Sequence, residues 1–357
     1  MLAVAAGTPN SLEIIGLVAL SDPPRSDSAA LISELQTLGV ETVMVTGDAP
    51  TTAAIVARAV GLNGKVCPMG PIPGNVKPAD YSVFASILPE GKYDLVKAFQ
   101  KDDFVVGMCG DGANDAPALR QAQMGIAVSD ATDVAKSAAG IVLTEGGLSG
   151  IVASVREGRA AFQRILTYTL NSVMKKILQV LLLAVGLVMT GHAVLTPMLM
   201  VIIMITGDFL AMSLATDRVR PSKLPNTWKI GNITVAGVIF GLCFLAFAVT
   251  MLAIGKFQLG MNLDALRTLS AVAIVFGSQA ATYVIRGRRH LWGLRPSIWL
   301  VSSSILDVLI ISTLAVRGIA MAPLPLSIVA FVFAGAVAFG LILDIVKMPV
   351  FARLSIS

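Results

Sequence analysis

The residues best suited to chemistry lie in a short run, 109–117, that follows an apolar stretch of strand length. Two carboxylates, Asp111 and Asp115, and the amide of Asn114 stand within five residues of one another. The glycines that flank Asp111 let backbone approach a phosphate, and hard carboxylate oxygens suit Mg²⁺ better than they suit softer ions. The run therefore predicts a turn that handles phosphate and magnesium.

Two further elements that suit anions occur upstream in the chain. The turn Thr46-Gly47-Asp48 closes an apolar run at 42–45, and Lys92 stands in the segment Pro-Glu-Gly-Lys. A lysine taken alone is most often an ordinary surface residue. The position of Lys92 between the two turns instead favours a role at a phosphate.

The elements that must position these residues alternate between strand-like and helix-like patterns. Such alternation predicts an α/β domain with a mostly parallel sheet, in which ligands bind at the carboxyl ends of the strands. Asp48 and Asp111 fall at such ends. The expected strands are 14–20, 42–45 and 104–109, and the expected helices are 26–38, 51–60 and 93–100. The Pro- and Gly-rich segment 68–80 predicts a surface loop.

Composition separates this part from the rest of the chain. The 357 residues are 55% hydrophobic and 14% charged, with a mean hydropathy of +0.79, which is far from an ordinary soluble domain. We therefore expect domains at 1–160 and 161–357, the second of them in a membrane. The three cysteines have no paired or metal-binding spacing and predict buried thiols in a reducing compartment. The net charge of +5 is explained by contact with anionic lipid headgroups, so it does not indicate a nucleic-acid partner.

Six apolar stretches follow Arg164, each close to the ~20 residues that cross a bilayer. They are 165–189, 194–215, 233–254, 268–285, 298–316 and 324–345. Arginine and lysine gather in two of the intervening loops, at 218–229 and at 286–295. Because basic loops stay on the cytoplasmic side, this pattern predicts an integral protein of the plasma (inner) membrane with both termini and the soluble domain in the cytoplasm.

The chain resembles the P-type ATPases, the cation pumps that form an aspartyl phosphate on a haloacid dehalogenase-like domain. The resemblance covers nearly the whole chain, and the segment around Asp217 and Trp228 is most similar to the proton-pumping branch. It implies an α/β haloacid dehalogenase-like phosphorylation domain, here incomplete, followed by an all-α membrane domain of six transmembrane helices. The motifs that carry it are residues 22–25, Thr46-Gly47-Asp48, the segment 89–92, the Gly-Asp-Gly-Ala-Asn-Asp block that begins at Gly110, and 130–144.

The same resemblance implies roles in ATP hydrolysis with Mg²⁺ as cofactor. Lys92 would neutralise phosphoryl oxygens, Thr46 and the backbone of Gly47 would donate hydrogen bonds to them, and Asp48 would orient its loop. Asp111 would bind the Mg²⁺, with Asn114 and Asp115 in support.

The nucleophile of this family lies in an Asp-Lys-Thr-Gly motif, which does not occur in this sequence. We therefore expect this chain alone to lack covalent phosphoryl transfer, and its sheet to have a gap, with poorly formed or slipped strands beside it. A separate N-terminal pump polypeptide would supply the missing strand. The alternatives are a non-catalytic remnant, a regulatory partner of a complete pump, or an incomplete reading frame.

Ionisable residues within the apolar stretches predict the transport function. Asp208 falls where proton pumps of this family keep their proton acceptor, and burial would favour its protonation. Lys175 and Lys176 are the expected counter-charges, with snorkelling to the interface as the alternative. The sequence has Leu178 and Gly207 where those pumps have arginine and asparagine. H⁺ is therefore the expected cargo, with another monovalent or divalent cation as the alternative.

Three other polar residues have simpler interpretations. Asp307 and Asp344 stand near or within apolar stretches, and we expect them to be structural partners of small polar neighbours. His192 is expected to be exposed in a loop outside the membrane, since one histidine without a neighbouring ligand does not indicate a metal site.

Overall fold

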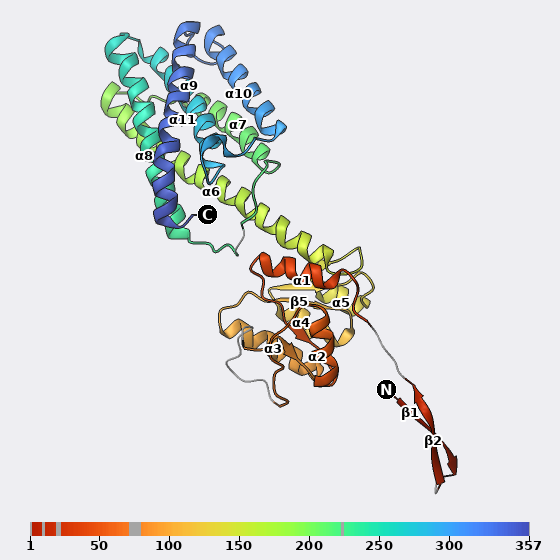
Figure 1. Cartoon of the computed structure of the whole chain (residues 1–357). Coiled ribbons are helices and arrows are strands. Elements are labelled where there is room, and N and C mark those ends of the chain that lie inside the picture. The colour runs from red at the N-terminus through yellow and green to blue at the C-terminus, as the bar shows by residue number, and fades with distance from the viewer. Residues whose placement is uncertain (1, 9–10, 19–22, 71–79, 223–224, 357) are drawn as a thin grey trace. The chain divides into compact units, whose positions relative to one another are not determined.

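A computed structural model describes residues 2–8, 11–18, 23–70, 80–222 and 225–356. The chain divides into two compact units, one formed by 1–156 with 223–225 and the other by 157–222 with 226–357 (Figure 1). Asp22, the last two residues of the expected strand 14–20, most of the expected loop 68–80 and Lys223 lie outside the described residues.

The first unit begins with an antiparallel hairpin of β1 (Leu2–Thr8) and β2 (Ser11–Val18). The apolar run at 14–20 is thus a strand over its described part, but it pairs with β1 and belongs to neither parallel sheet. Its large apolar side chains, among them Ile14 and Ile15, are exposed. The strand propensity of this run was predicted correctly, but a hairpin partner N-terminal to it was overlooked.

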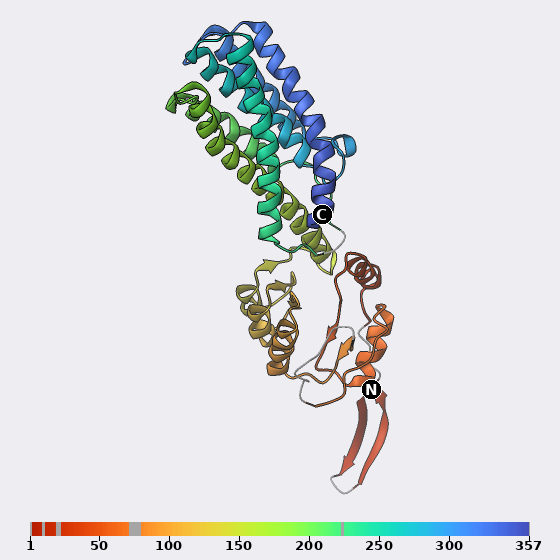
Figure 2. The same ribbon diagram turned by 90° about the vertical axis from the view of Figure 1, so that its left-hand side faces the viewer.

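Two small parallel sheets follow. β3 (Met44–Val45) pairs with β4 (Val83–Phe84), and β5 (Gly107–Gly110) pairs with β6 (Met124–Ala127), which in turn pairs with β7 (Ile141–Val142) (Figure 2). The parallel pairing confirms the expected α/β class. Among the described residues β3 and β5 are not paired with each other, although both turns of interest follow them. The expected slippage of these strands stays a prediction.

Helices connect the strands. α1 (Ser28–Thr37), α2 (Pro50–Ala59) and α3 (Pro89–Lys101) match the three predicted helices, and α3 starts one turn earlier than expected. Proline at the first position of α2 and of α3 fits the start of a helix, where its missing N–H leaves no bond unmade. The short helices α4 (Ala116–Gln121) and α5 (Asp133–Ala138) were not predicted, because six residues are too few for a periodic pattern.

An aromatic cluster joins α3 to β4 and to the segment before β5. Phe84 of β4 lies edge-to-face with Phe99 of α3 at a ring distance of 5.9 Å, and Phe99 lies edge-to-face with Phe104 at 6.4 Å. Leu95 and Val106 belong to the same cluster. The helix that carries Lys92 is therefore fixed both to the sheet of β3 and to the segment that leads into β5.

Gly125 in β6 tests this packing. A Cβ at this position would lie 2.3 Å from the carbonyl oxygen of Leu119, so Gly125→Ala must push α4 away from β6. We expect a loss of about 1–3 kcal/mol in the free energy of unfolding of the first unit, measured by chemical denaturation. Gly107→Ala in β5 is the matched control, because its Cβ would meet Met124 at an ordinary contact distance of 3.5 Å. Equal losses in both variants would contradict the packing described here.

Among the described residues, six helices have the length and apolar composition to span a membrane, which confirms the predicted all-α region. They belong to the second unit, apart from the start of the first of them. α6 begins well before the predicted start at 165 and runs without interruption. The other bounds agree with the predictions to within a few residues, except that α11 continues beyond 345. The helices are α6 (Ser149–Thr190), α7 (Pro197–Leu214), α8 (Ile230–Ala253, continued by a π-helical turn), α9 (Leu263–Ile285), α10 (Ile298–Arg317) and α11 (Leu326–Leu354).

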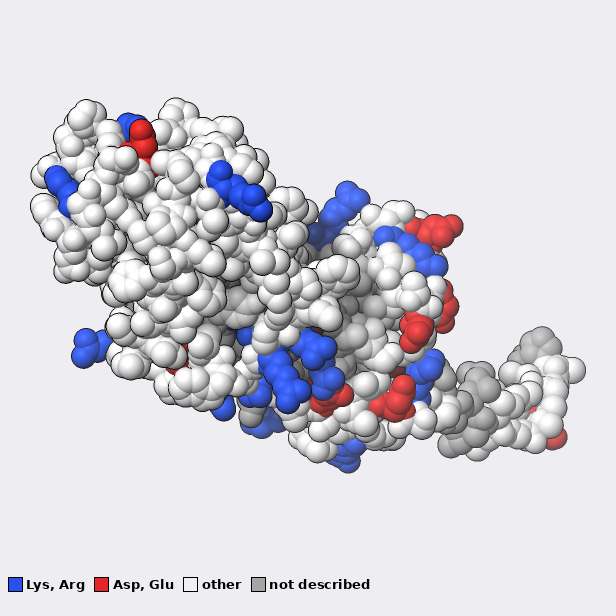
Figure 3. All heavy atoms as spheres, turned by 90° about the horizontal axis from the view of Figure 1, so that it is seen from above, with Lys and Arg blue, Asp and Glu red and all other residues white. Residues whose placement is uncertain are grey.

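The core of this unit forms around α9, which packs against α7, α8, α10 and α11 (Figure 2). Most of α9 is buried, and its neighbours supply large aromatic side chains such as Phe244 of α8 and Phe339 of α11, whose rings stack at 5.3 Å. Charged residues are sparse on the face of these helices that Figure 3 shows. Such an apolar exterior suits a lipid environment.

Candidate functional site

The Gly-Asp-Gly turn is organised by Asp115. Lys92 donates a hydrogen bond from Nζ to Asp115 Oδ1 at 2.6 Å, and the backbone N–H groups of Asp111 and Gly112 donate to Asp115 Oδ2 at 3.2 and 3.3 Å. Asp115 is buried, whereas the Lys92 side chain keeps 20% of its exposure. The carboxylate thus fixes a partly accessible ammonium group beside the turn that follows β5.

The second turn is closed by its own side chains. Thr46 donates from Oγ1 to Asp48 Oδ2 at 2.8 Å, and the backbone N–H of Asp48 donates to Thr46 Oγ1 at 3.1 Å. The N–H groups of Ile87 and Ser86 donate to the carbonyls of Thr46 and Asp48. Since α3 starts two residues after Ile87, these bonds connect the Thr-Gly-Asp turn to the helix that carries Lys92.

The remaining predicted site residues are open to solvent. Asp111, Asn114 and Gly47 are exposed, and among the described residues the side chains of Asp111 and Asn114 form no hydrogen bond. Both oxygens of Asp115 are already engaged, so this carboxylate has little capacity left for a metal. The donor set therefore fits Mg²⁺ through Asp111 alone, which agrees with the habit of this ion of using one or two carboxylates plus water and substrate phosphate.

Cys109 reports on the charge of this turn. Cys109 is exposed, so the expectation that all three thiols are buried is wrong for this residue. Desolvation by the surrounding turn raises the pKa of the Cys109 thiol, and the nearby carboxylates of Asp111 and Asp115 raise it further. Because the thiolate is the reactive form, Cys109 should be alkylated more slowly at pH 8 than a free thiol. Asp111→Asn should speed the reaction, since it removes one of the charges that disfavour the thiolate.

The measurement is the rate of iodoacetamide labelling at Cys109, followed by peptide mass spectrometry. If Asp111 binds Mg²⁺, adding the ion should speed the labelling of the unmodified chain and leave Asp111→Asn unaffected. Buried Cys67 in the same unit is the internal control, because its label should not respond to Mg²⁺. A rate at Cys109 that neither Mg²⁺ nor the substitution changes would contradict a metal site at Asp111.

In the second unit, Asp208 is exposed, although we expected it to be buried. It lies on an exposed face of α7 together with apolar side chains such as Ile205, Phe209 and Met212. The reason is that the other described helices pack against the opposite face, which contains Ile203 and Leu210. The described helices of this chain therefore do not by themselves provide the burial that a proton acceptor at Asp208 requires.

The two predicted counter-charges differ in position. Lys176 is exposed, whereas Lys175 is partly buried and interacts electrostatically with Asp208. A Cβ at Gly207 would lie 3.6 Å from Lys175 Nζ, so the amine occupies the region into which a side chain at 207 would extend. This geometry explains how the chain accommodates glycine where asparagine was expected. Among the described residues Lys175 forms no ion pair within 4 Å.

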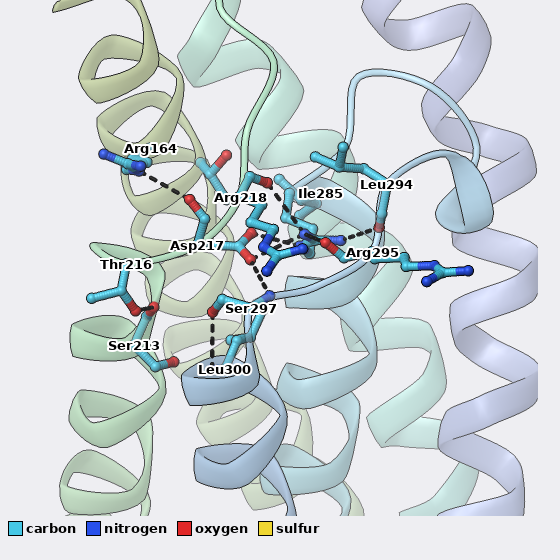
Figure 4. Close-up of polar contacts among 12 residues, drawn as sticks. Arg164, Ser213, Thr216, Asp217, Arg218, Ile285, Leu294, Arg295, Ser297 and Leu300 are labelled. Atoms are coloured by element: carbon cyan, nitrogen blue, oxygen red, sulfur yellow. Dashed lines mark hydrogen bonds and ion pairs between the residues drawn. The ribbon is translucent and has the colours of Figure 1, made fainter. Parts of the chain in front are cut away.

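A buried ion pair joins the ends of three helices. Arg286 donates to both oxygens of Asp217, from Nε at 2.6 Å and from an Nη at 3.0 Å, and the backbone N–H of Ser297 donates to the same carboxylate (Figure 4). Ser297 in turn caps α10, and Arg286 also donates to carbonyls in the loop before it, at Leu294 and Arg295. Sequence analysis placed these arginines in a basic loop but gave no sign of their partners.

Asp344 is also paired, but not with small polar residues as expected. Its carboxylate accepts hydrogen bonds from the buried Lys347 at 2.7 Å and from the backbone N–H of Leu291, and it lies 2.9 Å from His290 Nδ1. The spacing of three residues within one helix could have indicated the Asp344–Lys347 pair. His192 is exposed, as predicted.

The chain is similar to known proteins in both of its parts. Residues 2–123 match the family of haloacid dehalogenase-like hydrolases. Over 355 residues the chain is 31% identical to a protein of Methanocaldococcus jannaschii named "Putative cation-transporting ATPase", an alignment that covers 96% of this chain and 44% of that protein. The chain thus spans less than half the length of this relative. It carries a haloacid dehalogenase-like domain followed by membrane-type helices, and over most of its length it is similar to this relative, a cation-transporting ATPase by name.

Proposed function

We propose that the chain is the C-terminal part of an ATP-driven cation pump and that the pump exports protons through an aspartyl-phosphate intermediate. The observation that carries the proposal is the 2.6 Å contact of Lys92 with Asp115, which fixes a lysine beside the Gly-Asp-Gly turn in a chain whose other unit has six membrane-type helices. The likeness to a relative whose name includes cation transport supports the same conclusion.

Each residue of the site has a role in phosphoryl transfer. The Lys92 ammonium neutralises charge on the phosphoryl oxygens, and Asp115 holds that ammonium in place. The backbone N–H of Gly47 offers a hydrogen bond, and the Thr46 hydroxyl offers a second one once it turns away from Asp48, to which it donates in this structure. Through that contact Asp48 orients the turn. Asp111 is the carboxylate that would hold Mg²⁺, and bound Mg²⁺ supplies charge neutralisation at the phosphate of ATP.

The helical unit provides the transport path. Asp208 and Lys175 lie on neighbouring parts of α7 and α6, and further helices against the exposed face of α7 would bury them. The basic loops 218–229 and 286–295 support a proposed orientation with the first unit and both termini on the cytoplasmic side of the plasma (inner) membrane. Anionic lipids there complement the positive charge of these loops.

The nucleophile must come from outside these 357 residues, because no Asp-Lys-Thr-Gly occurs among them. We therefore propose that this chain alone does not hydrolyse ATP and that a separate or upstream polypeptide completes the site. The test is Mg²⁺-dependent ATP hydrolysis with trapping of the phosphoenzyme, on the purified chain alone and together with any polypeptide encoded in frame upstream.

Activity that requires the upstream piece, with the label on that piece, is the expected result. Labelled phosphate on this chain alone would contradict the proposed position of the nucleophile. No activity in either preparation would favour a remnant, or a regulatory partner that binds a complete pump through its helices.

A further inference from the structure

Buried carboxylates in the helical unit fall into two kinds. Asp217 pairs with Arg286, and Asp344 pairs with Lys347. Asp307 of α10 is buried just as deeply, at 1% exposure, yet among the described residues it has no cation within 4 Å. Its hydrogen-bond partner is a neutral amide, since Gln279 Nε2 of the central helix α9 donates to Asp307 Oδ2 at 2.9 Å.

The amide next to Asp307 is itself incompletely bonded. Gln279 is 7% exposed, and its Oε1 has no hydrogen-bond donor among the described residues. Ser304 Oγ, one turn before Asp307 in α10, is also buried without a partner in the part of the chain that the structure describes. Gln279 Oε1 and an ionised Asp307 carboxylate are both acceptors only, so no proton is available for a hydrogen bond between them. A protonated Asp307 supplies that proton, because a carboxylic acid and a primary amide can exchange two hydrogen bonds.

We propose that Asp307 and Gln279 form an acid–amide pair that binds one proton within the membrane. An ionised carboxylate at this depth, without a cation in contact, is strongly disfavoured, and such a group takes up a proton instead. Protonation also gives a donor to Gln279 Oε1, which otherwise stays buried without a hydrogen bond. Both effects favour the same state of Asp307.

The charges around the pair agree with a single proton. Lys175 of α6 interacts electrostatically with Asp307 and with Asp208 of α7. The charged residues of α9, Asp264 and Arg267, pair with each other at its N-terminus, and Asp344 and Lys347 of α11 pair beside the loop that follows α9. Lys176, the residue after Lys175, is exposed, so the partly buried ammonium between the two carboxylates is that of Lys175. One proton on Asp307 removes the negative charge that Lys175 leaves unbalanced.

The acid–amide pair would be a second proton site beside that at Asp208. Its role in transport rests on the proposed function, but the binding of a proton by Asp307 does not. Protonation itself does not depend on ATP. Infrared spectroscopy of the full chain in lipid therefore tests the pair even if the hydrolysis experiment fails. Conversely, the pair can be disproved even if ATP hydrolysis is observed.

The experiment records the C=O stretch of protonated carboxylic acids at neutral pH, with its isotope shift in D₂O. The unmodified chain should show this band and Asp307→Asn should lack it. Gln279→Leu should keep the band but shift it, because the amide no longer bonds to the acid. Asp264→Asn is the matched control, since that carboxylate is exposed and paired with Arg267 and should not contribute. Thermal unfolding verifies that each variant is folded.

Two results would overturn the proposal. The first is a band that persists in Asp307→Asn, or that disappears in Asp208→Asn, which would assign the proton to another carboxylate. The second is the absence of a band together with stabilisation of the chain by Na⁺ or K⁺ that is lost in Asp307→Asn. That result would replace the proton with a monovalent metal ion.

Discussion

Substitution of Arg286 by alanine should lower the free energy of unfolding of the helical unit by about 3–5 kcal/mol, because it leaves the buried Asp217 carboxylate without its cation. The guanidinium also donates to carbonyls of the loop before α10, including Leu294, so these acceptors lose their donor as well. Because Ser297 both donates to Asp217 and caps α10, the start of that helix should loosen with the pair. Denaturation of the full chain in detergent micelles measures the effect.

Arg267→Ala is the matched control for this prediction. Arg267 also pairs with an aspartate and also donates to a backbone carbonyl, but its partner Asp264 is largely exposed. Exposed pairs of this kind contribute about 0–1 kcal/mol. A double variant of Arg286 and Asp217 should lose less than the sum of the single losses, because it leaves no unpaired charge behind. Similar losses at Arg286 and Arg267 would show that the buried pair is not a structural anchor.

The sequence predicted the elements whose patterns are long. Apolar stretches near 20 residues located six helices, and helical periodicity located α1, α2 and α3. It did not predict β4, β6 and β7, because strands of two to four residues carry no alternation that can be recognised. It also assigned the run at 14–20 to the wrong kind of sheet, since strand pairing depends on the partner and not on the run itself.

The candidate site was predicted by residue type but not by partnership. Motif spacing brought Lys92 and the Gly-Asp-Gly turn into one hypothesis, and the structure joins them through Asp115. The different positions of Asp111 and Asp115 could not be predicted, because one carboxylate faces solvent and the other is buried, bonded to Lys92 and to the backbone of the turn. Contacts over long sequence separations, such as Asp217 with Arg286, left no local pattern to read.

The same limit explains the misplaced emphasis in the membrane unit. Asp208 attracted attention as a carboxylate in the middle of an apolar stretch, yet it lies on an exposed face of α7. Asp307 was interpreted as structural, and it proves to be the deeply buried carboxylate with a neutral partner. Hydropathy places a residue along the membrane normal but does not tell which face of the helix it occupies. The exposure and the partners of the two carboxylates, which only the structure supplies, make Asp307 a better candidate for a buried proton site than Asp208.

Lys92→Ala should reduce the rate of phosphoenzyme formation by about 10²–10³-fold in the preparation completed by the upstream polypeptide, a loss typical of removing one preorganised charge from a transition state. Among the described residues, Lys92 is the cationic side chain that contacts the Gly-Asp-Gly turn directly through Asp115. No neighbouring cation there is in place to substitute for it. Removing it also leaves Asp115 buried with only its backbone donors, Asp111 and Gly112.

The matched control is Lys97→Ala, on the same helix and with the same change of charge. Lys97 is exposed and lies over the ring of Tyr93 at 4.5 Å, away from the turn, so the rate should stay unchanged. Asp115→Asn separates positioning from charge, because it keeps Lys92 but weakens its anchor. Its rate should fall between those of Lys92→Ala and the unmodified protein. If Lys97→Ala slows the reaction as much as Lys92→Ala, the lysines act through the net charge of α3, and the contact with Asp115 has no special part in the chemistry.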